Sequence, residues 1–193
     1  MTTARWDYWN GPDETDRRIR YAKEFKPEYQ QNGGEVQRRI AAVVTAFRAE
    51  TQIELLGGYA SGWRPATVNE ATANAGKLSA HLTAEAGDKR DTPDGDFAWW
   101  CARNEGALAQ HGLYMEHPVA TVVRAWRAAR GEREPTPWCH LTTRPPASHA
   151  RVYWPDAKAQ GEWRALLAKG GHTGMTYEAW RALTQAPAAE DES

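Results

Sequence analysis

Hydrophobic side chains recur at helical spacing between residues 36 and 47. The positions that set this pattern are Val36, Ile40, Val43, Val44 and Phe47. Because residues three or four apart share one face of a helix, the pattern predicts an amphipathic helix over residues 35–49.

The segments on either side of this helix are less regular. Residues 1–33 are polar and aromatic, with turn-forming residues at 10–13 and 32–34, and are predicted to form an N-terminal arm of short elements. Ile53–Tyr59 has strand composition. Thr67–Leu82 is rich in Ala, Asn, Thr and Gly and is predicted to be irregular.

The middle of the chain alternates helical patterns with short strands. One helix is predicted to begin at Asp96, as its N-cap, and to end at Gly112. Its inward residues are Phe97, Trp100, Cys101 and Leu108. A strand over Leu113–Glu116 follows, and a further helix is predicted to be closed by Gly131. That helix carries Val119, Val122, Val123 and Trp126.

The C-terminal part begins with a predicted strand over Trp138–Thr142. Two short helices follow, one around residues 163–167 and one around 177–183. Residues 186–193 form an acidic tail that is expected to be disordered. Helices mixed with short strands, without regular βαβ alternation, predict an α+β fold with a small, mainly antiparallel sheet packed with helices. We therefore expect one domain over residues 1–185.

Composition and charge exclude several classes of function. The chain has 193 residues, of which 41% are hydrophobic and 25% charged, with a net charge of −1. The 24 basic and 25 acidic residues are spread along the chain, whereas nucleic-acid binding favours clustered Lys and Arg. No apolar run approaches the ~20 residues of a membrane span, and the first residues lack the pattern of a signal peptide. We expect synthesis in the cytoplasm, with Cys101 and Cys139 as thiols.

Candidate chemistry lies in the segment from Ser79 to Asp88. Imidazole and carboxylate groups are good zinc ligands, and a catalytic zinc needs three protein ligands. A turn through residues 84–87 would bring His81 and Asp88 to one point, and His140 on its predicted strand is the best third ligand. A hydrogen-bonded His–Asp pair without a metal is an alternative. The other histidines are also open as ligands: His111, His117, His149 and His172.

Three segments together resemble a known family. Ser79–Asp88 resembles the S-x-H-x-x-G-x-A-x-D signature of the zinc D-Ala-D-Ala peptidases, the VanX-like and phage-endolysin family with the Hedgehog/DD-peptidase fold. Ser61–Asn69 resembles its S-G-[YW]-R-x-x-x-x-N segment, and Trp138–Leu141 its closing W-x-H strand. Residues 112–116 and 143–146 are similar to a phage and prophage branch. The resemblance runs from about Tyr8 to Pro155, with the motifs in the expected order.

The resemblance implies a zinc site made by His81, Asp88 and His140. It also implies that Arg64 faces the substrate and helps to neutralise the oxyanion, and that Ser79 hydrogen-bonds substrate or a neighbouring ligand. From the residues alone, a surface salt bridge would be the favoured role of Arg64.

Two positions depart from the family pattern. Ala84 replaces a glycine, which is tolerable only if the position does not need a positive φ. Pro137 stands three residues before His140, where many members carry the acidic general base. Glu116 is the favoured substitute, because its strand should pair with Trp138–Thr142 and strand partners lie roughly 5 Å apart. An exposed strand-end carboxylate is the alternative role of Glu116, and Glu134, in a loop, is the second candidate base.

These features predict a zinc metallopeptidase that hydrolyses peptide bonds in bacterial peptidoglycan, as a D-Ala-D-Ala carboxypeptidase or a cell-wall endopeptidase encoded by a phage. Its partners would be peptidoglycan stem peptides, and it would act on the cell wall or as a virion component. The alternative is a catalytically degenerate, zinc-binding phage structural or wall-binding protein of the same fold, with phage virion proteins as partners.

Overall fold

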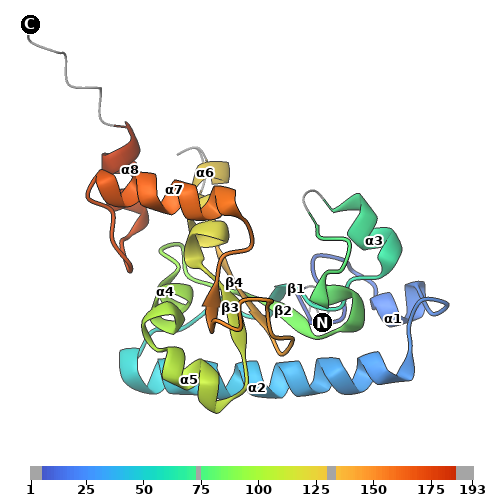
Figure 1. The fold of residues 1–193 in the computed structure, drawn as a ribbon. Helices are drawn as coiled ribbons and strands as arrows, with labels where there is room; N and C mark the ends of the chain where they lie inside the picture. The colour runs from blue at the N-terminus through green and yellow to red at the C-terminus, as the bar shows by residue number, and fades with distance from the viewer. Residues whose placement is uncertain (1–5, 73–74, 130–133, 186–193) are drawn as a thin grey trace, which may run out of the picture.

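A computed structural model describes residues 6–72, 75–129 and 134–185 of the chain. The fold is mixed α+β, with one five-stranded sheet in the order β1-β2-β4-β3-β5 (Figure 1). The strands are β1 Tyr59–Ser61, β2 Ala86–Arg90, β3 Tyr114–Glu116, β4 Trp138–Thr142 and β5 Val152–Tyr153. All neighbouring pairs are antiparallel except β3 and β5, so the sheet is mainly antiparallel, as predicted.

Helices surround this sheet. The α-helices are α1 Arg17–Arg20, α2 Pro27–Thr51, α3 Ala66–Ala71, α4 Asp96–Arg103, α5 Glu105–Gln110, α6 Val122–Ala129, α7 Ala157–Ala168 and α8 Tyr177–Gln185. Two 3-10 helices are η1 Ala80–Thr83 and η2 Pro118–Ala120. Figure 1 shows the long α2 running beneath the sheet, with α3 on one side above it and α6 and α7 on the other.

The predicted helix over residues 35–49 is present, but α2 begins earlier, at Pro27. The turn predicted at residues 32–34 is therefore wrong. Gly33 lies inside the helix, where a Cβ atom would come within 2.4 Å of the Trp9 ring. This glycine thus allows close packing of the N-terminal segment against α2 and does not form a turn. A proline at the first helical position also suits a helix start.

Three other boundaries differ from prediction. Residues 53–58 form no strand, and β1 begins only at Tyr59. The segment predicted to be irregular, Thr67–Leu82, contains most of α3 and η1. The helix predicted over residues 96–112 is two helices that meet at Asn104, whose side chain donates to the Trp100 carbonyl.

Asp96 is also not an N-cap, because it is the first residue of α4. The buried carboxylate of Asp91 replaces it by accepting hydrogen bonds from the backbone N–H groups of Phe97 (3.0 Å) and Ala98 (2.9 Å). The predicted helix after residue 119 divides into η2 and α6. Its predicted end at Gly131 and the predicted tail over 186–193 lie outside the described residues.

The two faces of β4 have different environments. Cys139 and Leu141 are fully buried in the core, and both cysteines are free thiols, as predicted. His140, between them, points to the opposite face because side chains alternate along a strand. Three of the tryptophans, Trp63, Trp99 and Trp126, are at most 1% exposed and fill the core. In the part of the chain that is described, no helix combines the length and apolar character needed to cross a bilayer.

Candidate metal centre

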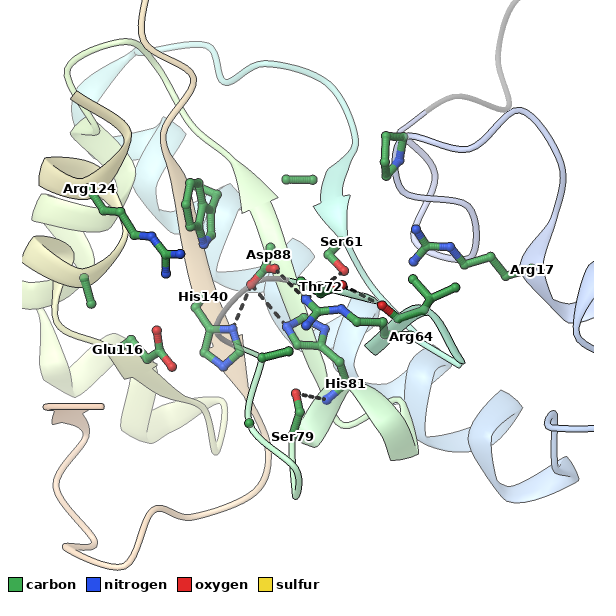
Figure 2. Close-up of a pocket in the computed structure, with 17 residues that line it drawn as sticks. Arg17, Ser61, Arg64, Thr72, Ser79, His81, Asp88, Glu116, Arg124 and His140 are labelled. Atoms are coloured by element: carbon green, nitrogen blue, oxygen red, sulfur yellow. Dashed lines mark hydrogen bonds and ion pairs between the residues drawn. The ribbon is translucent and has the colours of Figure 1, made fainter. Parts of the chain in front are cut away.

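Strand register brings the candidate residues into one row across the sheet. Ser61 lies opposite Asp88, and Asp88 lies opposite His140. On the other side of β4, Met115 pairs with Leu141, so the same register places Glu116 beside His140. Directly opposed residues point to the same face of a sheet. Four polar side chains from four strands therefore face one cavity (Figure 2).

His81 reaches this row from η1, the short helix before β2. The Ser79 hydroxyl caps η1 by accepting from the His81 backbone N–H at 3.3 Å. Ala84 ends η1 in the left-handed region, at φ 57°. The position therefore does adopt the positive φ that a glycine would favour. The reversal turns the chain into β2 and brings His81 and Asp88 together.

Distant residues hold this reversal in place. The buried Tyr8 hydroxyl lies 2.8 Å from the Ala84 carbonyl oxygen and 2.9 Å from that of Ala86. Arg144, just after β4, donates to the Leu78 carbonyl at 3.0 Å and forms an ion pair with Glu85. The segment that carries His81 is thus fixed at both ends to the rest of the fold.

The three predicted ligands converge on one point. The ligand atoms of His81, Asp88 and His140 all lie within 4.8 Å of one another. Asp88 Oδ1 is 2.7 Å from His140 Nδ1 and 3.3 Å from His81 Nε2. All three residues are buried, at 3%, 7% and 9% exposure for His81, Asp88 and His140. Among the described residues, this is the one group of three or more such side chains placed to hold a metal ion.

The hydrogen bonds of His81 favour a cation between the ligands. His81 Nδ1 lies 2.7 Å from the Gly62 carbonyl oxygen, which can only accept, so Nδ1 carries a proton. Burial lowers the pKa of His81 against the attraction of Asp88, which favours the neutral ring with a lone pair on Nε2. Two acceptors, Nε2 and the Asp88 carboxylate, then face each other at 3.3 Å. A metal cation or a second proton on His81 would join this pair, and a backbone carbonyl on the other ring nitrogen is the usual support of a metal-binding histidine.

The pKa values of His140 and Asp88 also reflect the negative charge gathered at this site. Burial lowers the pKa of His140, but the charge of Glu116, together with the hydrogen bond and charge of Asp88, outweighs it and raises the pKa to about 9. Burial opposes ionisation of Asp88, yet the hydrogen bond and charge of His140, and the charge of His81 when that ring is protonated, hold the pKa of Asp88 well below its usual range. A proton on His140 or a divalent cation would each compensate the negative charge of the nearby carboxylates. His140 would have to lose that proton in order to bind the metal.

No family model, curated protein or solved structure matches this chain.

Arg64 lies beside the ligands and is held by them and by its neighbours. Its guanidinium donates to Ser61 Oγ at 3.2 Å and to Asn69 Oδ1 at 3.3 Å, and lies 3.7 Å from Asp88 Oδ2. Burial lowers the pKa of Arg64, partly offset by Asp88. The residues alone favoured a salt bridge on the surface; Arg64 does form an ion pair, with Asp88, but that pair is not on the surface, because the two side chains are only 11% and 10% exposed.

The two candidate bases occupy different environments. The predicted pairing of the Glu116 strand with Trp138–Thr142 is present, and Glu116 lines the same cavity as Asp88 and His140. Figure 2 shows its carboxylate beside the His140 ring. Glu134 is exposed and does not line the cavity, and Pro137 is buried. The geometry therefore favours Glu116.

The other histidines lie outside the metal-binding group. His117 stacks on Trp154, with ring centroids 4.0 Å apart. His149 and His172 are exposed and His111 is half-buried.

Sequence reasoning missed several residues in and beside the cavity. Ser61 and Asn69 were inside the quoted motif but had no assigned role, and here they hold Arg64. Arg17 and Arg124 also line the cavity, and no motif pointed to either of them. They reach the site from α1 and α6, which only the tertiary fold brings to it.

Proposed function

We propose that the protein is a zinc-dependent peptidase that hydrolyses peptide bonds in bacterial peptidoglycan, built on a Hedgehog/DD-peptidase-like fold. The observation that carries the proposal is the contact between two acceptors, His81 Nε2 and Asp88 Oδ1, 3.3 Å apart with His140 beside them. Two imidazoles and one carboxylate, with room for a further ligand, are the donor set of a catalytic zinc site.

The residues around the ligands suit peptide hydrolysis. A zinc ion held by His81, Asp88 and His140 would polarise the scissile carbonyl and lower the pKa of a bound water toward about 7. Arg64 supplies fixed positive charge next to the ligands, where negative charge develops on the carbonyl oxygen. Glu116, which lines the same cavity, would take the proton of the attacking water and pass it to the leaving nitrogen.

The peptidoglycan substrate is supported by the resemblance of the three motif segments and by the shape of the site. The cavity above the ligands has a volume of about 420 Å³ and opens between α3 and α6. An opening of this size can receive a short peptide in extended form. A protein with this activity would act on the cell wall, either released or as part of a virion.

The test is product analysis on defined substrates. Full-length protein with zinc is incubated with purified peptidoglycan fragments, and products are identified by mass spectrometry. We expect one new pair of peptide products, absent when Asp88→Asn replaces the wild type, because the amide lacks the charge that binds the cation. Full zinc occupancy without any product would instead support the catalytically degenerate protein, for which Pro137 at the usual base position is the motivating observation.

A further inference from the structure

A second cavity lies beside the one that holds the three candidate ligands. This cavity, of about 440 Å³, lies between α6 and the start of α7. Glu116, Ala120 and Arg124 line both cavities, so the two cavities adjoin at these residues. A ligand that occupies the first cavity can extend past Glu116 toward Arg124.

Three arginines line the first cavity, and they differ in their partners. Arg17 is buried, bonded to Asp13 at 2.8 Å and to the Trp63 carbonyl at 3.1 Å. Arg64 is bonded to Ser61 and Asn69. The side chain of Arg124 makes no hydrogen bond or ion pair with any residue that the structure describes. Figure 2 shows it extending from α6 into the opening that Glu116 and His140 face. It is therefore the cavity arginine whose guanidinium is available to a ligand.

The position of Glu116 sets the direction of the substrate. In hydrolysis the water oxygen bonds to the carbonyl carbon and the carbon–nitrogen bond breaks. The proton that the base removes from water is delivered to the leaving nitrogen, and the other product is a carboxylic acid. The leaving nitrogen must therefore lie next to Glu116, on the α6 side of the ligands. The residue that carries this nitrogen then lies next to Arg124.

We propose that Arg124 binds a carboxylate on the leaving residue of the substrate. The inference rests on the proposed peptidase function and names a specificity determinant for it. Arginine suits this ligand because its planar guanidinium can pair with both oxygens of a carboxylate. A C-terminal residue supplies the carboxylate from its terminus, and an internal acidic residue supplies it from its side chain.

Two other cations, Arg127 and Lys158, line the second cavity, but of the three only Arg124 also lines the first cavity, beside the ligands. Arg127, one turn further along α6, forms an ion pair with Glu162 at 2.7 Å. The Asp156 carboxylate accepts from the Ala159 backbone N–H at 2.7 Å and so caps α7. Arg127 therefore offers a matched control on the same helix, since its charge already has a partner.

The experiment measures binding and turnover separately. Three probes are compared: N-acetyl-L-Lys-D-Ala-D-Ala as the free acid, its C-terminal amide, and an amide in which the last residue is D-Glu. Binding is measured by isothermal titration calorimetry on full-length, zinc-loaded Glu116→Gln protein, so that cleavage is suppressed. We expect at least one acidic probe to bind more tightly than the plain amide, by roughly 10- to 100-fold, as for a charge-assisted hydrogen bond.

Adding Arg124→Gln should remove this preference and leave the affinity for the plain amide unchanged, whereas adding Arg127→Gln should preserve it. A preference for the free acid identifies a terminal carboxylate, and one for the D-Glu amide a side-chain carboxylate. Equal affinity for all probes, no binding of either acidic probe, or a preference that survives Arg124→Gln overturns the inference.

Turnover of the same probes by the wild type tests the proposed function independently. If the probes are cleaved but Arg124→Gln leaves their binding and turnover unchanged, only the proposed role of Arg124 is contradicted. If binding depends on Arg124 but no peptide is cleaved, only the proposed peptidase function is contradicted.

Discussion

The two sides of the site are built differently. On the side of β1, α3 and η1, each polar group has a partner: Arg64 is bonded to Ser61 and Asn69, and His81 to the Gly62 carbonyl. We call this the bonded side. On the side of β3 and α6, the open side, the side chains of Glu116 and Arg124 make no hydrogen bond or ion pair with other described residues.

This difference matches two kinds of task. Groups that hold an ion or stabilise a developing charge act best when their geometry is fixed beforehand. Groups that must exchange a proton or pair with an incoming ligand have to be free beforehand. The bonded side therefore suits metal and oxyanion binding, and the open side suits proton transfer and substrate recognition.

Among substitutions that test this difference between the two sides, we expect the largest effect on kcat at Glu116. Glu116→Gln removes the base without removing a bond, so kcat should fall by ~10²–10⁴-fold while zinc content and unfolding midpoint stay unchanged. Steady-state kinetics on a cleaved fragment, with zinc analysis and thermal unfolding, check this. Glu134→Gln is the control and should do little. Equal activity of Glu116→Gln and wild type would remove Glu116 as the base.

A substitution on the bonded side should change both rate and stability. Arg64→Gln removes the positive charge beside Asp88, so kcat should fall by ~10²-fold. It also breaks the bonds to Ser61 and Asn69, which should lower the free energy of unfolding by ~1–2 kcal/mol. Denaturant unfolding measures the second effect. A loss of rate with unchanged stability would contradict the distinction between the two sides.

On the open side, the half-buried His117 is expected to make the stability of the folded protein depend on pH. Burial lowers its pKa to about 4, below the 6.5 of the unfolded chain. Protonation of His117 therefore lowers the free energy of unfolding as the pH falls from 6.5 toward 4, and has no effect above pH 6.5. The loss is at most about 3 kcal/mol, and smaller to the extent that solvent screens the ring.

His117→Asn keeps an acceptor for the Val119 N–H, as His117 Nδ1 does at 3.3 Å, but cannot titrate. Urea unfolding between pH 4 and 7 should show a shallower acid loss for this variant than for the wild type. Parallel pH curves for the two proteins would show that His117 is not the source.

The smallest effect is expected at Ala84, whose positive φ strains the bonded side. Ala84→Gly should relieve a left-handed conformation that costs an alanine ~1 kcal/mol. Loss of a buried methyl group opposes this, so we expect a gain of about 0.5 kcal/mol in unfolding free energy with unchanged zinc content. A clear loss of stability would show that packing of the methyl group dominates.

Local pattern was a reliable guide to some elements and a poor one to others. The strands at 114–116 and 138–142 carry β-branched or aromatic residues beside turn residues, and both were predicted within one residue. Strand β2, Ala-Gly-Asp-Lys-Arg, was missed because its composition does not favour a strand, and its pairing with β1 and β4 decides its conformation.

The same limit applies to the site. His81, Asp88 and His140 could be named as ligands because the quoted motifs contain them, and the structure brings them together. Arg124 and the second cavity could not be predicted, since they depend on where α6 and α7 pack. Whether Ala84 takes a positive φ was equally open, because the chain reversal that requires it is fixed by Tyr8 and Arg144, far away in sequence.

The central claim, that His81, Asp88 and His140 hold a zinc ion, is tested most directly by metal content. Protein purified with zinc and dialysed is analysed by inductively coupled plasma mass spectrometry, alongside His81→Ala, His140→Ala and the control His172→Ala. We predict one zinc per chain in the wild type and the control, and none in the other two variants. Full zinc in His140→Ala, or no zinc in the wild type, would contradict the claim.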